Sequence, residues 1–429
     1  MTDGRIVITG MGAVTPIGIG VSSYWKNLIA GTNGISLIER FDSSGLPVKV
    51  AGEIKDFVAS DFLSKKVART MDLFMQYAFA AAQEALEAAR LKEKIEPERV
   101  GIVVGTALGG VTTAAKTQER ITEKQSYRVS PYTVPKMLGN IAASQIAIHH
   151  DIKGPNLTVN TACSSGADAI GMAQMLLQAG QADAVIAVGA ESILTELMAA
   201  GLVSARALST EENPKQASRP FDAKRNGFVM GEGAGALVLE KMDGAVKRNT
   251  PIEAELLGYA SNTDAYHVTS PEPEGNGQIR CMEAAMAQAG LEVGQIDYMN
   301  AHGTATPLGD QIETSSIKKV FGKEAYDIPV SSTKGATGHL MGAGGVTELI
   351  ACIKAIQDGV MPPTLNYEEI DASCDLDYIP GIARDKEVKI AMSNAFGFGG
   401  QNTSLIVGEY EPNVSWIGKK ERLRNDFHV

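Results

Sequence analysis

Short apolar runs alternate with amphipathic segments along the first half of the chain. The apolar runs at residues 5–10, 100–106 and 183–192 predict strands, and the segments at about 24–30 and 74–91 predict helices. A long excursion at about 109–153 precedes a further strand and helix within residues 157–180. Strands that alternate with helices in this way indicate an α/β protein with a mostly parallel sheet.

The second half repeats this pattern. Residues 227–242 and 252–262 predict strands, and residues 279–291 predict a helix. Three pairs of segments share one pattern across the halves, namely 157–180 with 328–359, 100–110 with 296–310, and 183–192 with 388–407. Such similarity indicates a duplication. We therefore predict a first half at 1–250, a second half at 251–410 and an extension at 411–429, with the two halves packed as one unit.

Composition and charge narrow the classes of function. The 429 residues carry a net charge of −11, which disfavours nucleic acid as a partner. No apolar run approaches the roughly 20 residues of a membrane span, and the start MTDGRIVITG lacks the pattern of a secretory signal. The 4 cysteines lack the spacing of a disulfide framework or a metal site. These features predict a cytoplasmic protein without a metal, a nucleic-acid partner or a membrane span.

The glycines near the N-terminus superficially resemble a dinucleotide-binding fingerprint. Gly10 and Gly12 follow the first predicted strand, but Thr15 and then Pro16 stand where the third glycine would be. We interpret this segment as a structural turn. The chain also has no GxxxxGK[ST] phosphate loop.

Cys163 has the sequence setting of a nucleophile. A short strand leads into TACSSG, and a helix of small residues follows. Backbone N–H groups and the positive end of a helix dipole favour a thiolate over a thiol at such a place. A small buried core cysteine is the ordinary alternative, and it is our interpretation of Cys281, Cys352 and Cys374.

Two histidines strengthen this prediction. His302 follows a predicted strand in YMNAHGTATPLGD, and His339 lies in glycine-rich turns between a strand and a helix. Strand ends are where α/β sheets usually place their chemistry, so three such ends can bring Cys163, His302 and His339 together. Lys334 and Glu348 flank His339 and could orient it or tune its charge.

Four motifs carry a resemblance to a known family. TACSSG, HGTATPLGD, STKGATGHLMGAGG and NAFGFGGQN occur in this order, and the chain resembles the elongating β-ketoacyl-[acyl-carrier-protein] synthases, most closely the bacterial type II enzymes, over residues 1 to about 408. The resemblance implies the thiolase fold, in which two βαβαβαββ halves form five α-β-α-β-α layers. It also implies a homodimer and an acyltransferase of fatty acid biosynthesis. No bound cofactor is implied, because the substrates arrive on the phosphopantetheine of acyl carrier protein.

The resemblance assigns catalytic roles to the motif residues. Cys163 would take the acyl chain as a thioester, and His302 and His339 would stabilise the enolate formed when malonyl-[acyl-carrier-protein] loses carbon dioxide. The acyl chain would then grow by two carbons in a decarboxylative Claisen condensation. The other implied catalytic positions are Lys334 and Glu348 in support of His339, Asp310 in the loop after His302, and Phe398 as a gate, whose N–H would form an oxyanion hole with that of Cys163.

The resemblance also assigns binding positions. Thr304 and Thr306 would contact the phosphopantetheine arm. The remaining implied substrate positions are Phe396, Thr269, Leu108, Thr133 and Leu202. The implied carrier-docking positions are Lys65, Lys66, Arg69, Arg128 and Arg206, although a charge run such as Lys65 and Lys66 is equally typical of a solvated helix face.

Single residues separate the competing functions. A thiolase would need a second cysteine in NAFGFGGQN, an initiating synthase would have Asn at His339, and a non-catalytic chain-length subunit would lack Cys163. A ketosynthase of a dissociated type II polyketide synthase, paired with a chain-length-factor subunit, remains as the alternative. Thr133 and Leu202, where phenylalanine is common, and Gln401, where Thr or His is usual, keep that alternative open.

Overall fold

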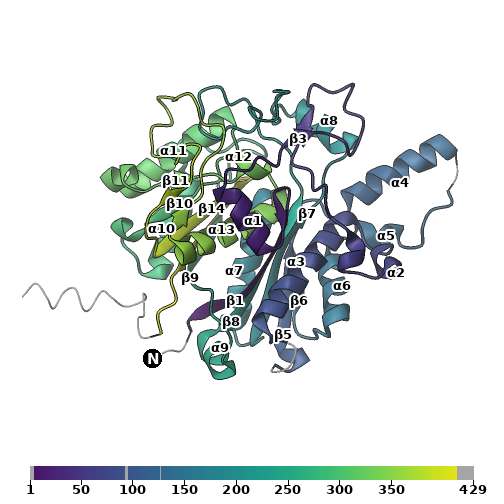
Figure 1. The fold of residues 1–429 in the computed structure, drawn as a ribbon, viewed down its shortest axis with the longest axis horizontal. Coiled ribbons are helices and arrows are strands. Elements are labelled where there is room, and N and C mark those ends of the chain that lie inside the picture. Colours follow the sequence, from purple (N-terminus) through teal and green to yellow (C-terminus); the bar gives the residue numbers. More distant parts are fainter. Residues whose placement is uncertain (1–3, 92–94, 126, 413–429) are drawn as a thin grey trace, which may run out of the picture.

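The chain forms two halves that lie on opposite sides of the molecule. The computed structural model describes residues 4–91, 95–125 and 127–412. In Figure 1 the first half, purple to teal, and the second half, green to yellow, meet along the centre. None of the helices in these ranges is long and apolar enough to cross a membrane.

The first half is built on a mixed sheet with one antiparallel strand. Its main strands are β1 (Ile6–Thr15), β5 (Val100–Gly105), β6 (Asn156–Val159), β7 (Ala184–Glu191) and β8 (Gly233–Lys241). Their order in space is β6-β5-β7-β8-β1. β8 runs antiparallel to β7 and β1, whereas β5 runs parallel to β6 and β7.

The second half repeats this topology. Its main strands are β9 (Ala254–Thr263), β10 (Tyr298–Asn300), β11 (Val330–Ser331), β14 (Ile390–Gly397) and β15 (Gln401–Gly408). Their order is β11-β10-β14-β15-β9, again with the last strand of the half antiparallel to its neighbours. β9 pairs with β1 and makes the two sheets continuous. The segment pairs singled out in the sequence therefore occupy equivalent positions, which confirms the predicted duplication.

Helices complete five layers. The outer face of the first half is covered by α3 (Leu73–Ala89) and α6 (Asn140–His150), and that of the second half by α10 (Asn276–Ala289) and α11 (Pro307–Phe321). α7 (Ser165–Gln178) and α13 (Gly344–Asp358) pack against each other between the halves, where their buried residues join both sheets in one hydrophobic core. This is the arrangement expected for a thiolase fold.

Shorter elements connect these layers. The helices are α1 (Val21–Ile29), α2 (Lys65–Ala68), α8 (Glu196–Ser204), α9 (Met242–Arg248) and α12 (Lys334–Thr337). The two-residue strands are β2 (Gly18–Ile19), β3 (Ser36–Leu37), β4 (Val50–Ala51), β12 (Val360–Met361) and β13 (Arg384–Asp385). The predicted division after residue 250 falls between α9 and β9, and residues 413–429 of the predicted extension lie outside the described residues.

The interpretation of Gly10 and Gly12 as a turn is wrong. Both glycines lie inside β1, against which α3 packs. A Cβ atom at Gly10 would come within 2.1 Å of the Ala85 carbonyl oxygen, and one at Gly12 within 2.0 Å of the Ala81 carbonyl oxygen. The glycines therefore let an alanine-rich helix approach the strand closely.

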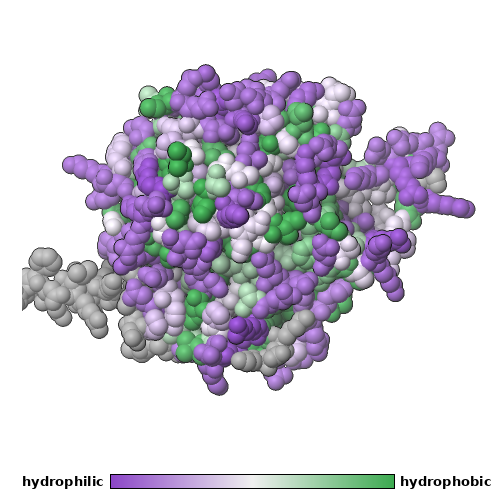
Figure 2. Space-filling model, in the orientation of Figure 1, coloured by the Kyte–Doolittle hydropathy of each residue, from purple (hydrophilic) through white to green (hydrophobic). Residues whose placement is uncertain are grey.

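The long excursion between β5 and β6 is largely helical. It contains α4 (Val111–Lys124) and α5 (Thr133–Met137) before α6. α4 projects from the body of the molecule (Figure 1), and hydrophilic residues cover the projection (Figure 2). α4 buries only Thr112 and its sequence is mostly polar, so it lacks the apolar run that marks the other helices, and it was not predicted.

Candidate active site

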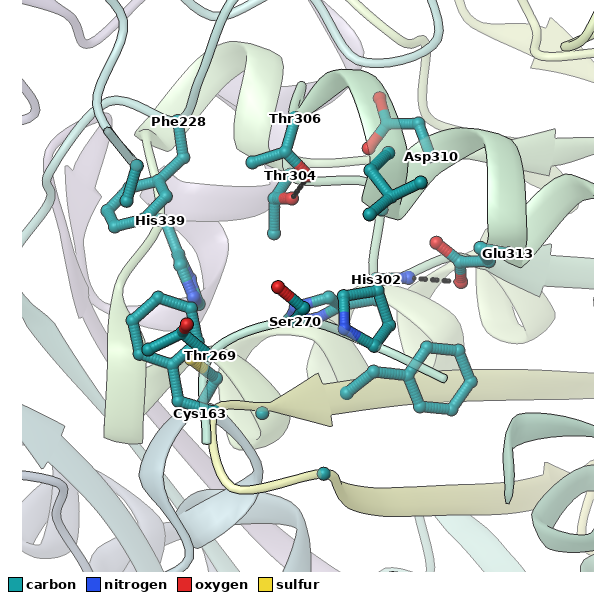
Figure 3. Close-up of a pocket in the computed structure, with 18 of the residues that line it drawn as sticks. Cys163, Phe228, Thr269, Ser270, His302, Thr304, Thr306, Asp310, Glu313 and His339 are labelled. Atoms are coloured by element: carbon teal, nitrogen blue, oxygen red, sulfur yellow. Dashed lines mark hydrogen bonds between the residues drawn. The ribbon is translucent and has the colours of Figure 1, made fainter. Parts of the chain in front are cut away.

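A cavity of about 300 Å³ lies at the junction of the two halves. Cys163, His302 and His339 line it together, as the strand-end argument predicts (Figure 3). Its wall also includes Phe396 from the end of β14 and Phe398 from the turn between β14 and β15. Residues from four separate parts of the chain thus converge on one space.

Cys163 sits in a single turn of 3-10 helix, Ala162–Ser164, directly before α7. Ala162 adopts a left-handed conformation with φ 53, which marks a sharp turn out of β6. The backbone N–H groups of Phe398 and Cys163 both face the thiol. These two donors are positioned to stabilise an anion at or beside the sulfur.

The expectation of a resting thiolate is wrong. Burial raises the pKa of the Cys163 thiol to about 11, although the N–H of Phe398 and the charge of Lys334 oppose the rise. Only 8% of the residue is exposed, so the loss of hydration outweighs the favourable dipoles. Cys281, Cys352 and Cys374 are also buried, as predicted for core cysteines.

His339 presents an N–H group to the cavity. Its Nδ1 accepts a hydrogen bond from the Met341 N–H at 3.3 Å, so the ring proton of the neutral imidazole belongs on Nε2. Burial and the charge of Lys334 hold the pKa of His339 well below its usual range. The buried Nε2 has no hydrogen-bond partner among the described residues. It is therefore available as a donor to a substrate.

His302 lies beside His339, with 5.4 Å between the ring centroids and nearly perpendicular planes. Burial, Lys334 and His339 hold the pKa of His302 well below its usual range, so this ring is neutral as well. Its Nδ1 is buried and has no hydrogen-bond partner within the described ranges. Figure 3 shows both rings directed into the cavity above Cys163.

Lys334 and Glu348 form a buried ion pair behind the histidines. The Lys334 ammonium, at the start of α12, lies 2.5 Å from Glu348 Oε1 on α13. Burial raises the pKa of Glu348, and the lysine opposes this rise. The positive charge also lowers the pKa of Cys163, His302 and His339. Lys334 therefore acts on all three groups, whereas Glu348 acts through Lys334.

Two carboxylates of α11 hold the loop that carries His302. Asp310 accepts hydrogen bonds from the N–H groups of Phe221 at 2.7 Å and Ala305 at 3.1 Å, and burial raises its pKa to about 6. Glu313 accepts from the His302 N–H at 2.7 Å and the Gly303 N–H at 2.8 Å. Asp310 is expected here from the sequence, whereas Glu313 is not. The sequence holds one signal for Glu313, which is a second acidic residue about one helical turn after Asp310 on the same face of the helix.

Glu191 is a second buried carboxyl group near the site that the sequence does not predict. It lies fully buried at the end of β7 and accepts hydrogen bonds from the N–H groups of Ala107 at 2.6 Å, Leu108 at 3.2 Å and Gly342 at 3.2 Å. Burial raises its pKa to about 7. Glu191 thereby ties the end of β7 to two loops, one after β5 and one before α13. In the sequence, Glu191 looks like an ordinary polar residue at the end of a strand, so nothing there distinguishes it.

The turn that carries Phe398 is glycine-rich for a steric reason. A Cβ atom at Gly397 would lie 3.0 Å from the Cys163 backbone nitrogen, and Gly399 and Gly400 have φ 83 and φ 70. Only a glycine lets this turn come so close to the nucleophile. The Phe396 ring lies 6.0 Å from the His302 ring.

The predicted substrate positions fall into two groups. Thr304, Thr306 and Thr269 line the cavity, and Leu202 packs in the hydrophobic cluster that contains Cys163. Leu108, which is 40% exposed, and Thr133, at the start of α5, are not among the residues that line the cavity. The structure therefore brings Leu202, but not Thr133, toward the nucleophile within this chain.

The predicted docking residues are all exposed, but they do not form one cluster. Arg206 lines the cavity next to α8, whereas Lys65 and Lys66 on α2 and the adjoining Arg69 lie away from α8 in Figure 1. Arg128 lies in the segment that follows α4. No group of His, Cys, Asp and Glu that could hold a metal ion occurs in the described part of the chain.

Comparisons with known proteins agree with this geometry. Residues 3–245 match the family model "Beta-ketoacyl synthase, N-terminal domain", and residues 253–368 match "Beta-ketoacyl synthase, C-terminal domain". A 3-oxoacyl-[acyl-carrier-protein] synthase 2 of Synechocystis is 45% identical over 95% of this chain and 98% of the relative. The enzyme of the same name from Coxiella burnetii is 42% identical over 95% and 99%.

Solved structures give the same picture. The ishigamide ketosynthase/chain length factor has a TM-score of 0.89 at 33% identity and covers 95% of this chain and 100% of its own. A beta-ketoacyl synthase from Burkholderia phymatum has a TM-score of 0.87 at 35% identity, with the same coverage. These neighbours confirm the thiolase fold. With both family models matched and relatives 42% to 45% identical over 95% of its length, the chain, whose cavity brings together a cysteine, two neutral histidines and paired N–H donors, belongs to the β-ketoacyl synthase family of condensing enzymes.

Proposed function

We propose that the protein elongates acyl chains by two carbons through decarboxylative condensation with malonyl-[acyl-carrier-protein] in fatty acid synthesis. The observation that carries this proposal is the convergence of Cys163, His302 and His339, with two ring nitrogens of the histidines unpartnered among the described residues, on one cavity. Both substrates arrive as thioesters on the phosphopantetheine of the carrier protein, so no resident cofactor takes part.

In the first step the Cys163 sulfur attacks the carbonyl carbon of the acyl thioester. The carbonyl oxygen becomes an oxyanion, which the N–H groups of Cys163 and Phe398 stabilise. The bond from the carbonyl carbon to the phosphopantetheine sulfur then breaks. The proton of the Cys163 thiol ends on that leaving sulfur, which leaves the acyl chain on Cys163.

In the second step malonyl thioester loses carbon dioxide and becomes an enolate. The His339 Nε2–H, with a ring N–H of the neutral His302, donates to the developing enolate oxygen. The enolate carbon attacks the acyl carbon on Cys163, and the carbon–sulfur bond breaks. One proton from solvent returns the sulfur to a thiol, and the β-ketoacyl thioester departs on the carrier.

Neutral histidines suit this chemistry better than charged ones. Two imidazolium rings would repel each other beside Lys334, and burial penalises their charge. A neutral ring still donates one hydrogen bond. The lowered pKa values of both rings therefore keep the site competent throughout the neutral range.

We further propose that the carrier protein docks near Arg206. Because carriers of this type are acidic and this chain has a net charge of −11, docking requires a local basic surface. Arg206 stands at the cavity, and Lys65, Lys66, Arg69 and Arg128 are exposed basic residues that would contact a carrier farther from the cavity. A solved neighbour at 31% identity is a type II polyketide synthase acyl-carrier protein in complex with its ketosynthase.

A homodimer is proposed on separate grounds. β6 is the last strand of its sheet and is largely exposed, which leaves an edge open to pairing. Apolar residues are exposed along and beside it, among them Val134, Met137, Ile148 and Leu157. Thr133 lies on this same face, so it can reach an acyl channel only across an interface between two copies.

A ketosynthase of a polyketide pathway is less well supported than fatty acid elongation. The ketosynthase of the type II polyketide complex is 31% identical and the ishigamide ketosynthase/chain length factor is 33% identical, whereas the 3-oxoacyl-[acyl-carrier-protein] synthase 2 relatives are 42% to 45% identical over 95% of the chain.

The test of the proposed chemistry separates its two half-reactions. His302→Ala and His339→Ala should lose decarboxylation of malonyl-[acyl-carrier-protein] by about a hundredfold or more, because each removes a donor to the enolate oxygen. Acyl transfer to Cys163 should fall much less, because Cys163 and Phe398 provide that oxyanion hole. Carbon dioxide release and acyl-enzyme mass measure the two rates. Decarboxylation at the wild-type rate in both variants would refute the assignment.

A further inference from the structure

A buried carboxylate outside the cavity lies directly behind the nucleophile turn. Asp168, on the first turn of α7, is only 5% exposed. Its two oxygens accept hydrogen bonds from hydroxyl groups of Thr161 at 2.5 Å, Tyr259 at 2.9 Å and Thr403 at 2.7 Å, and Ser164 at 3.3 Å. Four side chains lose conformational freedom when their hydroxyl groups are held on one carboxylate, so the arrangement suggests a role for Asp168.

The donors come from both halves of the molecule. Thr161 and Ser164 flank Cys163 in its turn, whereas Tyr259 belongs to β9 and Thr403 to β15. Asp168 therefore links the first-half nucleophile turn to two strands of the second half.

The backbone around this link is shaped to permit it. A Cβ atom at Gly171, one turn after Asp168, would lie 2.1 Å from the Tyr259 ring, so the ring reaches Asp168 across a glycine. On the other side, the Cys163 turn packs against β14 and β15. β15 begins at Gln401, immediately after the turn that carries Phe398.

We propose that Asp168 is a positioning residue that fixes the Cys163 turn against β15 and so sets the spacing of the two oxyanion-hole N–H groups. One of these groups belongs to Cys163 in the first half and the other to Phe398 in the second. Neither half alone determines their separation. This inference rests on the proposed function, because the oxyanion hole matters only when the sulfur attacks a carbonyl.

That dependence provides a readout which a purely structural role would not produce. Acyl transfer to Cys163 develops charge on a carbonyl oxygen and needs both N–H groups. Alkylation of the same sulfur by iodoacetamide is a substitution at carbon that develops no oxyanion, so it depends on these N–H groups only through the thiolate fraction. Loss of the link should therefore slow acyl transfer far more than alkylation.

The sharpest variants lie on the second-half side of the link. Thr403→Val removes the hydroxyl donor and keeps the shape, and Thr403→Ser keeps the hydroxyl as its matched control. Asp168→Ala removes the carboxylate, whereas Asp168→Asn keeps one acceptor oxygen and adds an amide donor to which the hydroxyls can turn. Thermal unfolding of each variant shows that the comparison is made on folded protein.

We expect the rate of acyl transfer to fall about tenfold to a hundredfold in Thr403→Val and Asp168→Ala. Thr403→Ser should have nearly the wild-type rate. The rate of Asp168→Asn should lie between those of Asp168→Ala and the wild type. The double variant Asp168→Ala/Thr403→Val should be no slower than Asp168→Ala, because both changes break one link. In each variant the rate of Cys163 alkylation by iodoacetamide should fall much less than the rate of acyl transfer.

Three results would overturn the proposal. If the wild type acquires acyl mass and Thr403→Val acquires it equally fast, the inference about Asp168 is wrong while the proposed function stands. Equal loss of acylation and alkylation would mean a general disturbance of the turn. A wild type that acquires no acyl mass would overturn the proposed function together with this inference.

Discussion

The Cys163 sulfur experiences two opposing influences. Burial removes water from a would-be thiolate, while the N–H of Phe398 and the charge of Lys334 favour it, and burial dominates in the substrate-free protein. A thiol that stays protonated until a thioester occupies the cavity is protected from oxidation and from other electrophiles. The dipoles that fail to ionise the thiol at rest are well placed to stabilise the oxyanion.

The first prediction concerns this thiol. With a pKa of about 11, the thiolate fraction of Cys163 grows about tenfold with each pH unit through the neutral range. The rate of alkylation by iodoacetamide should therefore rise steadily from pH 7 to 10 without a plateau. Cys163→Ala provides the background from the other buried cysteines. A plateau reached by pH 8 would mean that the thiol ionises in the ordinary range.

At the scale of elements, the site is an assembly of strand ends and turns held by helix carboxylates. The sequence predicts the places of Cys163 and His302 well, because both closely follow a strand and chemistry favours strand ends, whereas α12 separates His339 from β11. Glu313, Glu191 and Asp168 do not stand out in the sequence. Their roles depend on backbone N–H and hydroxyl groups that approach from distant segments, so only the fold shows them.

The same reason explains the errors at element scale. Gly10 and Gly12 look like a turn locally, but the approach of α3 decides their role. α4 buries only Thr112 and α5 buries no residue within this chain, so neither carries an apolar run that would mark it in the sequence.

The second prediction concerns the hydrophobic cluster beside Cys163. Leu202 is 7% exposed and packs in that cluster, so Leu202→Phe adds volume where an acyl chain would lie. The preferred acyl chain should become shorter, at about 0.8 kcal/mol for each methylene that no longer fits. Acylation of Cys163 by carrier thioesters of graded length measures this, with Leu202→Met as a control of similar volume. An unchanged length profile would remove Leu202 from the acyl channel.

At the scale of the whole molecule, the two halves each contribute what the other lacks. The first half supplies Cys163, the second supplies both histidines and Phe398, and the central helices α7 and α13 hold them in register. The duplication is visible in the sequence as repeated patterns. The sequence does not show how the two halves face each other, because this depends on packing along α7 and α13 between them.

The third prediction concerns the charged surface. Lys65→Glu and Arg206→Glu should each raise the KM for carrier-bound substrate about fivefold, the effect of roughly 1 kcal/mol at an exposed ion pair. The KM for short pantetheine thioesters should change much less for Lys65→Glu, which lies on α2. Added salt should raise the KM of the wild type for carrier-bound substrate toward the values of the variants. Lys65→Arg keeps the positive charge and should have the KM of the wild type. Equal effects on carrier-bound and carrier-free substrates would argue against docking on this surface.

The central claim is that Cys163 accepts the growing chain, and intact-protein mass spectrometry tests it most directly. After incubation with acyl-[acyl-carrier-protein], the protein should gain the mass of one acyl group, located on the peptide that contains Cys163, and malonyl-[acyl-carrier-protein] should then discharge it as β-ketoacyl product. Cys163→Ala should gain no mass and make no product while it keeps its fold. Acyl mass on Cys281, Cys352 or Cys374, or condensation by Cys163→Ala at the wild-type rate, would contradict the account.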